Sequence, residues 1–167
     1  MKRRHTLALA ALPLWTGAFG AAAPADGPAV AWPEVALLDG SRFGAAQAAG
    51  RTVVVVFWST TCPFCRRHNQ HIEKLHRAAA AGRTLVVLGV ARERDAAAVA
   101  RYAAQQGYSF PLTLDHAPLA AALGARRLIP LTVVVDRLGR RGSVIPGEMF
   151  EEDVMELLQL ADKEART

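Results

Sequence analysis

The sequence predicts an α/β fold in which a central mixed β-sheet is flanked by helices and preceded by an N-terminal β-hairpin extension. Three observations support this prediction. Continuous runs of β-branched and aromatic residues, such as TVVVVFW at 52–58, are typical of strands covered on both faces. Helical segments separate the early strands, which indicates parallel strands joined by right-handed crossovers. The last two predicted strands are joined by a short turn, which indicates an antiparallel edge.

The first half of the folded region begins with a predicted hairpin over 35–43. Two short segments flank an Asp-Gly turn signal there. The buried strand 52–58 follows, and then a helix over 63–81, where inward-facing residues recur at intervals of three or four. The apolar run LVVLGVA at 85–91 predicts a second buried strand.

The second half is predicted to add three helices and a hairpin. Residues 96–106 form a helix, because an aspartate before it can cap its start and a glycine follows its end. A short helix is expected at about 118–123. Strands at 131–136 and 142–145 are joined by a short Gly-containing turn as a hairpin. The last helix, 151–164, has its apolar residues on one face.

The N-terminus is typical of an export signal. Three basic residues precede an uncharged segment, 6–23, rich in alanine and leucine and followed by small residues. We therefore expect a signal peptide over 1–25, a flexible leader over 26–33 and one folded domain over 34–165. An uncleaved membrane anchor is the alternative, because the uncharged run is close to the length that spans a bilayer. Either way, we expect a periplasmic location, with the protein tethered to the inner membrane if the N-terminus is uncleaved.

The charge balance argues against a nucleic-acid-binding protein. The 167-residue chain has a formal net charge of +5, from 20 Lys and Arg against 15 Asp and Glu. Three of the basic residues and none of the acidic ones lie in 1–25, so the remainder carries only +2. A charge this small provides no electrostatic surface for nucleic acid. No motif indicates a cofactor, and we expect none.

The only two cysteines, Cys62 and Cys65, stand in the stretch FWSTTCPFCRRH, where strand 52–58 gives way to helix 63–81. The unpaired N–H groups and the dipole at a helix N-terminus favour an anion, and so stabilise a thiolate at Cys62. Since the thiolate is the attacking form, Cys62 is the predicted nucleophile. Cys65 lies one turn further along and faces inward, so we expect it to resolve the mixed disulfide by forming a Cys62–Cys65 disulfide.

Two other uses of the cysteines are a structural disulfide and a metal site. A structural disulfide closing so short a loop would add little stability, because the gain grows with loop length. A metal site could draw on Cys62, Cys65, His68 and His71, which are ligands that suit zinc or copper. In an α-helix, a residue three positions further along lies about 60° back around the helix axis. These four side chains therefore cannot together form a tetrahedral metal site. We expect no metal, although a weaker copper site stays open.

His68 shares the inward face of the predicted helix with Cys65. We expect a partly buried histidine whose ring is satisfied by a backbone carbonyl. The alternative hypothesis is that His68 tunes the dithiol or relays a proton to Cys65.

These motifs resemble the thioredoxin superfamily, and more closely the exported TlpA/ResA-like thiol–disulfide oxidoreductases. The resemblance covers about residues 33–160, including LLDGSRF, GRTVVVVFWSTTCPFC, IPLTVVVDRLGR and PGEM. It implies a thioredoxin-like fold and a cis bond at Ile129-Pro130, where the Ile129 backbone would bind an extended partner chain. It also implies a periplasmic reductase that receives electrons from a membrane thiol carrier. Its partners would be cysteine pairs of other exported proteins, of the cytochrome c or copper-site maturation type.

The sequence departs from the family pattern at several positions near the cysteines. Thr61 stands where many relatives have tryptophan, and Val56 stands where thioredoxins proper bury an aspartate. The proton relay usually assigned to that carboxylate is therefore missing or replaced. The pair Pro63-Phe64 between the cysteines leaves the direction of electron flow open. Alternative functions are a copper chaperone that uses the same thiolates, or a thiol peroxidase.

Overall fold

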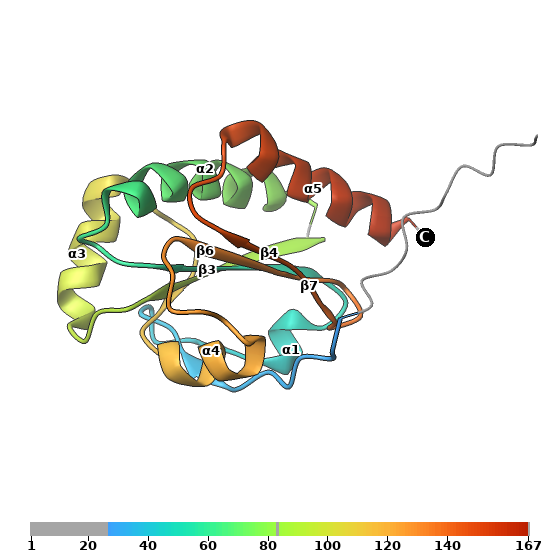
Figure 1. Ribbon diagram of the computed structural model, residues 1–167, viewed down its shortest axis with the longest axis horizontal. Coiled ribbons are helices and arrows are strands. Elements are labelled where there is room, and N and C mark those ends of the chain that lie inside the picture. The colour runs from blue at the N-terminus through green and yellow to red at the C-terminus, as the bar shows by residue number, and fades with distance from the viewer. Residues whose placement is uncertain (1–26, 83, 167) are drawn as a thin grey trace, which may run out of the picture.

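A five-stranded mixed sheet lies at the centre of the structure, a computed structural model that describes residues 27–82 and 84–166 (Figure 1). The strand order is β5-β4-β3-β6-β7, and a separate two-stranded sheet pairs β1 with β2. The predicted signal peptide lies outside the described residues. The strands are β1 (Val35–Ala36), β2 (Arg42–Phe43), β3 (Thr52–Trp58), β4 (Leu85–Ala91), β5 (Leu112–Thr113), β6 (Leu131–Val135) and β7 (Arg141–Pro146). The helices are α1 (Ala45–Ala48), α2 (Pro63–Ala79), α3 (Ala96–Gln106), α4 (His116–Leu123) and α5 (Glu151–Ala165).

The central strand β3 explains the mixed character of the sheet. It pairs in parallel with β4 and antiparallel with β6, and β6 pairs antiparallel with β7. All seven residues of β3 are buried, because it has a strand on each side and helices over both faces. The predicted fold class is therefore confirmed: a thioredoxin-like α/β fold with a mixed central sheet and an N-terminal hairpin.

The sheet separates two hydrophobic cores. Side chains alternate along a strand, so Val54, Val56 and Trp58 pack with α2, α3 and α5 on one face, together with Cys65. Val53, Val55 and Phe57 pack on the other face with residues of α4 and of the N-terminal segments. Figure 1 shows α2 and α5 on one side of the sheet and α1 and α4 on the other. The first face therefore carries the helix that begins at the cysteines.

The segment before β1 contacts the β6–β7 hairpin. The amide of Val30 donates to the Gly139 carbonyl at 2.8 Å, and the amide of Arg141 donates to the Pro28 carbonyl at 3.0 Å. An isolated antiparallel bridge joins Ala29 to Arg140. Residues 28–30 of the predicted leader, 26–33, are thus bound along the edge of the sheet.

Two short elements, α1 and β5, were not predicted. They have four and two residues, too few to form a periodic pattern, and depend on tertiary contacts. β5 pairs with β4 at Gly89, where an added Cβ would lie 2.6 Å from side-chain atoms of Phe110 and Leu112. The sequence also placed the start of α4 at Pro118, whereas it begins at His116. A proline is tolerated there because N–H groups in the first turn have no partner within the helix.

Candidate active site

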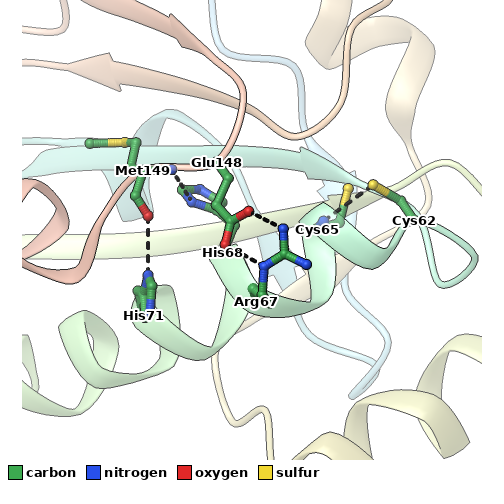
Figure 2. Close-up of polar contacts among 7 residues, drawn as sticks. All are labelled: Cys62, Cys65, Arg67, His68, His71, Glu148 and Met149. Atoms are coloured by element: carbon green, nitrogen blue, oxygen red, sulfur yellow. Dashed lines mark hydrogen bonds and ion pairs between the residues drawn. The ribbon is translucent and has the colours of Figure 1, made fainter.

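The two cysteines lie at the start of α2, beyond the carboxyl end of β3 (Figure 2). Cys62 is the N-cap residue of α2, and its Sγ accepts a hydrogen bond from the Cys65 amide at 3.2 Å. Pro63 occupies the first helical position, where its missing N–H costs no hydrogen bond. Both cysteines are free thiols in this structure; Cys62 is half-buried, and Cys65 is fully buried. One sulfur is therefore reachable from solvent, and its neighbour lies behind it.

The surroundings of Cys65 keep its proton on the sulfur. Burial is the largest cause that raises the pKa of Cys65 to about 12, and the hydrogen bond with Cys62 adds to it. The backbone of Ser59 acts in the opposite direction. At neutral pH Cys65 is thus a thiol that can donate to Cys62, which leaves Cys62 as the sulfur able to attack.

The loop between β3 and α2 is held by Glu93, a residue that sequence reasoning missed. One carboxylate oxygen, Oε1, accepts hydrogen bonds from the Ser59 hydroxyl at 2.8 Å and from the Thr60 amide and hydroxyl at 2.6 and 2.9 Å. Glu93 lies two residues beyond β4. Since β4 runs parallel to β3, their carboxyl ends meet at the same edge of the sheet. The sequence signal that could have identified Glu93 is an acidic residue two positions after the end of β4.

His68 is fully buried, and both of its ring nitrogens are hydrogen-bonded away from the cysteines. The Met149 amide donates to Nδ1 at 3.2 Å, so the proton lies on Nε2, which donates to the Thr132 hydroxyl at 2.9 Å. The partners are an amide and a hydroxyl rather than the expected backbone carbonyl. Burial is the largest cause that lowers the pKa of His68 to about 4. Both ring nitrogens are occupied by these hydrogen bonds, so neither is free to pass a proton to Cys65. The relay from His68 to Cys65 stays a hypothesis.

A second set of contacts joins α2 to the segment before α5. The Arg67 guanidinium donates twice to the Glu148 carboxylate, at 2.8 and 2.6 Å, and lies 5.0 Å from the centre of the exposed Phe64 ring. The His71 ring bonds the Met149 carbonyl at 3.1 Å (Figure 2). The hydrogen bonds from Arg67 are the main cause that lowers the pKa of Glu148. These contacts hold the first turns of α2 against the C-terminal part of the chain.

Ile129 and Pro130 precede β6, and the peptide bond between them is cis. Leu131, the next residue, pairs with Phe57 near the end of β3. Pro130 therefore lies beside the end of β3 that leads into the cysteine loop. Its carbonyl accepts the Gly147 amide at 2.8 Å.

An open pocket of about 240 Å³ lies next to Cys62. Its walls come from the cysteine loop, the first turn of α2 and one face of α3. The lining residues are Thr60, Thr61, Cys62, Pro63, Arg66, Tyr102 and Gln106.

Neither a metal site nor a membrane-spanning helix is found in the part of the chain that the structure describes. Within residues 27–82 and 84–166, no three or more His, Cys, Asp or Glu side chains are grouped so that they could hold a metal ion. No helix in those ranges is both long and apolar enough to cross a bilayer. The structure thus brings Cys62 and Cys65 together and directs His68 and His71 to other partners.

Comparisons with known proteins agree with this architecture. A model of the Redoxin family matches residues 20–154. The chain is 28% identical over 128 residues to the thiol-disulfide oxidoreductase ResA of Halalkalibacterium halodurans, covering 77% of this chain and 72% of that protein. It is 25% identical over 124 residues to the thioredoxin-like protein YneN of Bacillus subtilis, with 74% and 72% covered.

Solved structures give the same result. A thiol:disulfide interchange protein from Chlorobium tepidum superposes with a TM-score of 0.74 and 25% identity, covering 83% of this chain and 99% of the other. A secreted thiol-disulfide isomerase from Corynebacterium glutamicum superposes with a TM-score of 0.72 and 24% identity, covering 80% and 85%. At 24% identity, the similarity to the Corynebacterium glutamicum protein shows a shared fold.

Proposed function

The chain belongs to the Redoxin family and is an oxidoreductase of the thiol–disulfide type, and from this premise we propose that Cys62 and Cys65 are its catalytic dithiol. The observation that carries the proposal is the contrast between the two sulfurs. Cys62 is reachable at the N-cap of α2, whereas Cys65 is buried behind it with a raised pKa. Such a pair has one sulfur to attack a substrate and a second to release it.

The reaction proceeds in two exchanges. The Cys62 thiolate attacks one sulfur of a substrate disulfide, a Cys62–substrate bond forms, and the other substrate sulfur leaves as a thiolate that takes a proton from solvent. Cys65 then loses its proton and attacks Cys62 Sγ. The second substrate sulfur departs and is protonated, which leaves a Cys62–Cys65 disulfide. The substrate disulfide gains the two electrons that the dithiol loses.

The partners proposed are cysteine pairs of other exported proteins, with electrons arriving from a membrane thiol carrier. The basic and then uncharged N-terminal segment supports export to the periplasm. A related structure is that of a protein named as secreted. Outside the cytoplasm disulfides persist, so a reductase has substrates there. Ile129 and Pro130, beside the end of β3, are the proposed contact for the extended partner chain.

A trapping experiment tests the two cysteine roles. Incubated with a disulfide-containing protein, the Cys65→Ala variant should accumulate a mixed disulfide through Cys62, at least roughly tenfold more than Cys62→Ala, since no second sulfur resolves it. Non-reducing electrophoresis and mass spectrometry measure the adduct. Equal trapping by both variants would show that the assigned roles are wrong.

A redox equilibrium titration of the same dithiol tests the reducing direction. A potential near that of thioredoxin, about −270 mV, would support a reductase, whereas one near about −120 mV would mark an oxidant. Stoichiometric copper that survives dialysis without disulfide reduction would favour the chaperone alternative instead.

A further inference from the structure

The pocket next to Cys62 contains an arginine whose guanidinium has no hydrogen-bond or ion-pair partner among the described residues. Arg66 and Arg67 are adjacent on the first turns of α2, yet their surroundings differ. Arg67 donates twice to Glu148 and lies over the Phe64 ring. Arg66 lines the pocket, and across residues 27–82 and 84–166 its guanidinium has no hydrogen bond or ion pair. Burial raises the pKa of Tyr102, on the facing wall of the pocket, and the charge of Arg66 acts in the opposite direction.

Other hydrogen-bonding groups in the pocket are also free. The Tyr102 hydroxyl and the Gln106 amide line it from α3, and within the described ranges neither side chain has a hydrogen-bond partner. The Thr60 and Thr61 hydroxyls, by contrast, are bound to Glu93 and Ser59. No carboxylate is among the lining residues. The pocket therefore offers one cation and two polar groups that can donate to an anion.

The size and position of the pocket indicate what would occupy it. A volume of about 240 Å³ is below the roughly 300–1,000 Å³ of pockets that enclose whole small-molecule ligands. It suits a single side chain of a longer chain. Because Cys62 is part of its wall, that side chain would belong to a residue close to the cysteine under attack.

We propose that this pocket is a specificity subsite for an acidic side chain flanking the disulfide of a polypeptide substrate, with Arg66 as its cation. The subsite rests on the proposed thiol–disulfide exchange and specifies its substrate class. The pocket walls come from α3 and the cysteine loop rather than from Ile129 and Pro130, so the acidic residue would be held separately from the backbone contact there. Electrostatic complementarity of this kind selects among partners and speeds their encounter.

The test is single-turnover reduction of three peptides by the reduced full-length protein. Each peptide has one internal disulfide. The three peptides differ only in the residue placed next to each cysteine, which is Glu in one, Gln in the second and Lys in the third. In each turnover the Cys62–Cys65 dithiol is oxidised and the peptide disulfide is reduced, so no further reductant is needed. The Glu peptide should react about three- to tenfold faster than the Lys peptide, since ion pairs at exposed sites are modest. The ratio should shrink in about 0.5 M salt.

Arg66→Gln and Arg67→Gln are the matched variants. Arg66→Gln should bring the Glu-to-Lys rate ratio close to one, whereas Arg67→Gln should retain the wild-type ratio. A role for Arg66 only in stabilising the Cys62 thiolate would slow all three peptides equally and keep the ratio, which would overturn the subsite. Circular dichroism of both variants checks that they are folded.

The remaining outcomes separate the subsite from the proposed function. Equal rates for the three peptides in the wild-type protein would overturn the acidic subsite and leave the oxidoreductase function intact. Reduction of none of them would contradict the proposed function itself. Oxidised glutathione also has carboxylates near its disulfide. An Arg66-dependent rate with it but not with the Glu peptide would overturn the polypeptide substrate class.

Discussion

Cys62 and Cys65 are only three positions apart, yet the fold gives them different chemical surroundings. Cys62 is the N-cap residue of α2, and its Sγ accepts a hydrogen bond from the Cys65 amide. Cys65 is enclosed in the core on the α2 face of the sheet, so burial penalises its thiolate. At the scale of single residues, this difference in burial supports the proposed division between an attacking sulfur at Cys62 and a resolving sulfur at Cys65.

His68 is the second residue whose chemistry is set by burial, and it makes stability depend on pH. Its folded pKa of about 4 lies below the unfolded value of 6.5, so the unfolded chain binds the extra proton first as the pH falls. The neutral ring therefore stabilises the fold above pH 6.5, and that contribution is lost between pH 6.5 and 4. Wild type should lose about 2 kcal/mol more than His68→Gln between pH 7.5 and 5, because each pKa unit corresponds to about 1.4 kcal/mol.

Urea unfolding at the two pH values measures this difference. Thr132→Val is the control, because it removes a hydrogen-bond partner but retains the buried imidazole. It should be less stable at both pH values and keep the wild-type dependence on pH. Parallel curves for wild type and His68→Gln would contradict the predicted role of His68.

At the scale of elements, the loop between β3 and α2 depends on the end of β4. Glu93 holds Ser59 and Thr60 by three hydrogen bonds, and Cys62 follows two residues later. Removing this contact in Glu93→Ala should slow thiol–disulfide exchange at Cys62 by roughly three- to thirtyfold, because small losses of position at a reacting group are costly. Glu93→Gln keeps an acceptor oxygen and should recover most of the rate.

Asp95→Ala is the matched control for this prediction. Asp95 belongs to the same segment, but its side chain accepts the Ala98 amide at 3.0 Å and caps α3. The substitution should lower stability by about 1 kcal/mol and change the exchange rate little. Stopped-flow measurement of exchange compares the three variants. Similar rates in Glu93→Ala and Asp95→Ala would show that Glu93 does not position the loop.

At the scale of the whole molecule, the sheet keeps two cores apart, and only one of them surrounds the cysteines. Trp32 packs against the other core and meets the Phe43 ring edge-on, with 5.6 Å between ring centres. Trp32→Ala should therefore lower the free energy of unfolding by about 2 kcal/mol, less than for a fully buried tryptophan. The rate of thiol exchange should stay within about twofold of wild type.

Leu138→Ala provides the comparison for Trp32→Ala. Leu138 lines the same surface pocket as Trp32 but is 61% exposed, so its truncation should change stability by less than about 0.5 kcal/mol. Chemical denaturation gives both stabilities, and peptide reduction gives both rates. A large loss of exchange in Trp32→Ala would show that the two faces of the sheet are coupled.

The sequence by itself determined the buried strands, the long helices and the position of the dithiol between them. These features depend on local patterns: β-branched runs, helical spacing and a cysteine pair at a strand-to-helix junction. Only the tertiary structure decided that Glu93 supports the cysteine loop, that His68 faces Thr132 and Met149, and that Arg66 is left without the partner that Arg67 has. Those outcomes depend on contacts between residues 33 to 81 positions apart. No pattern within one segment encodes which side chains meet when distant segments pack together.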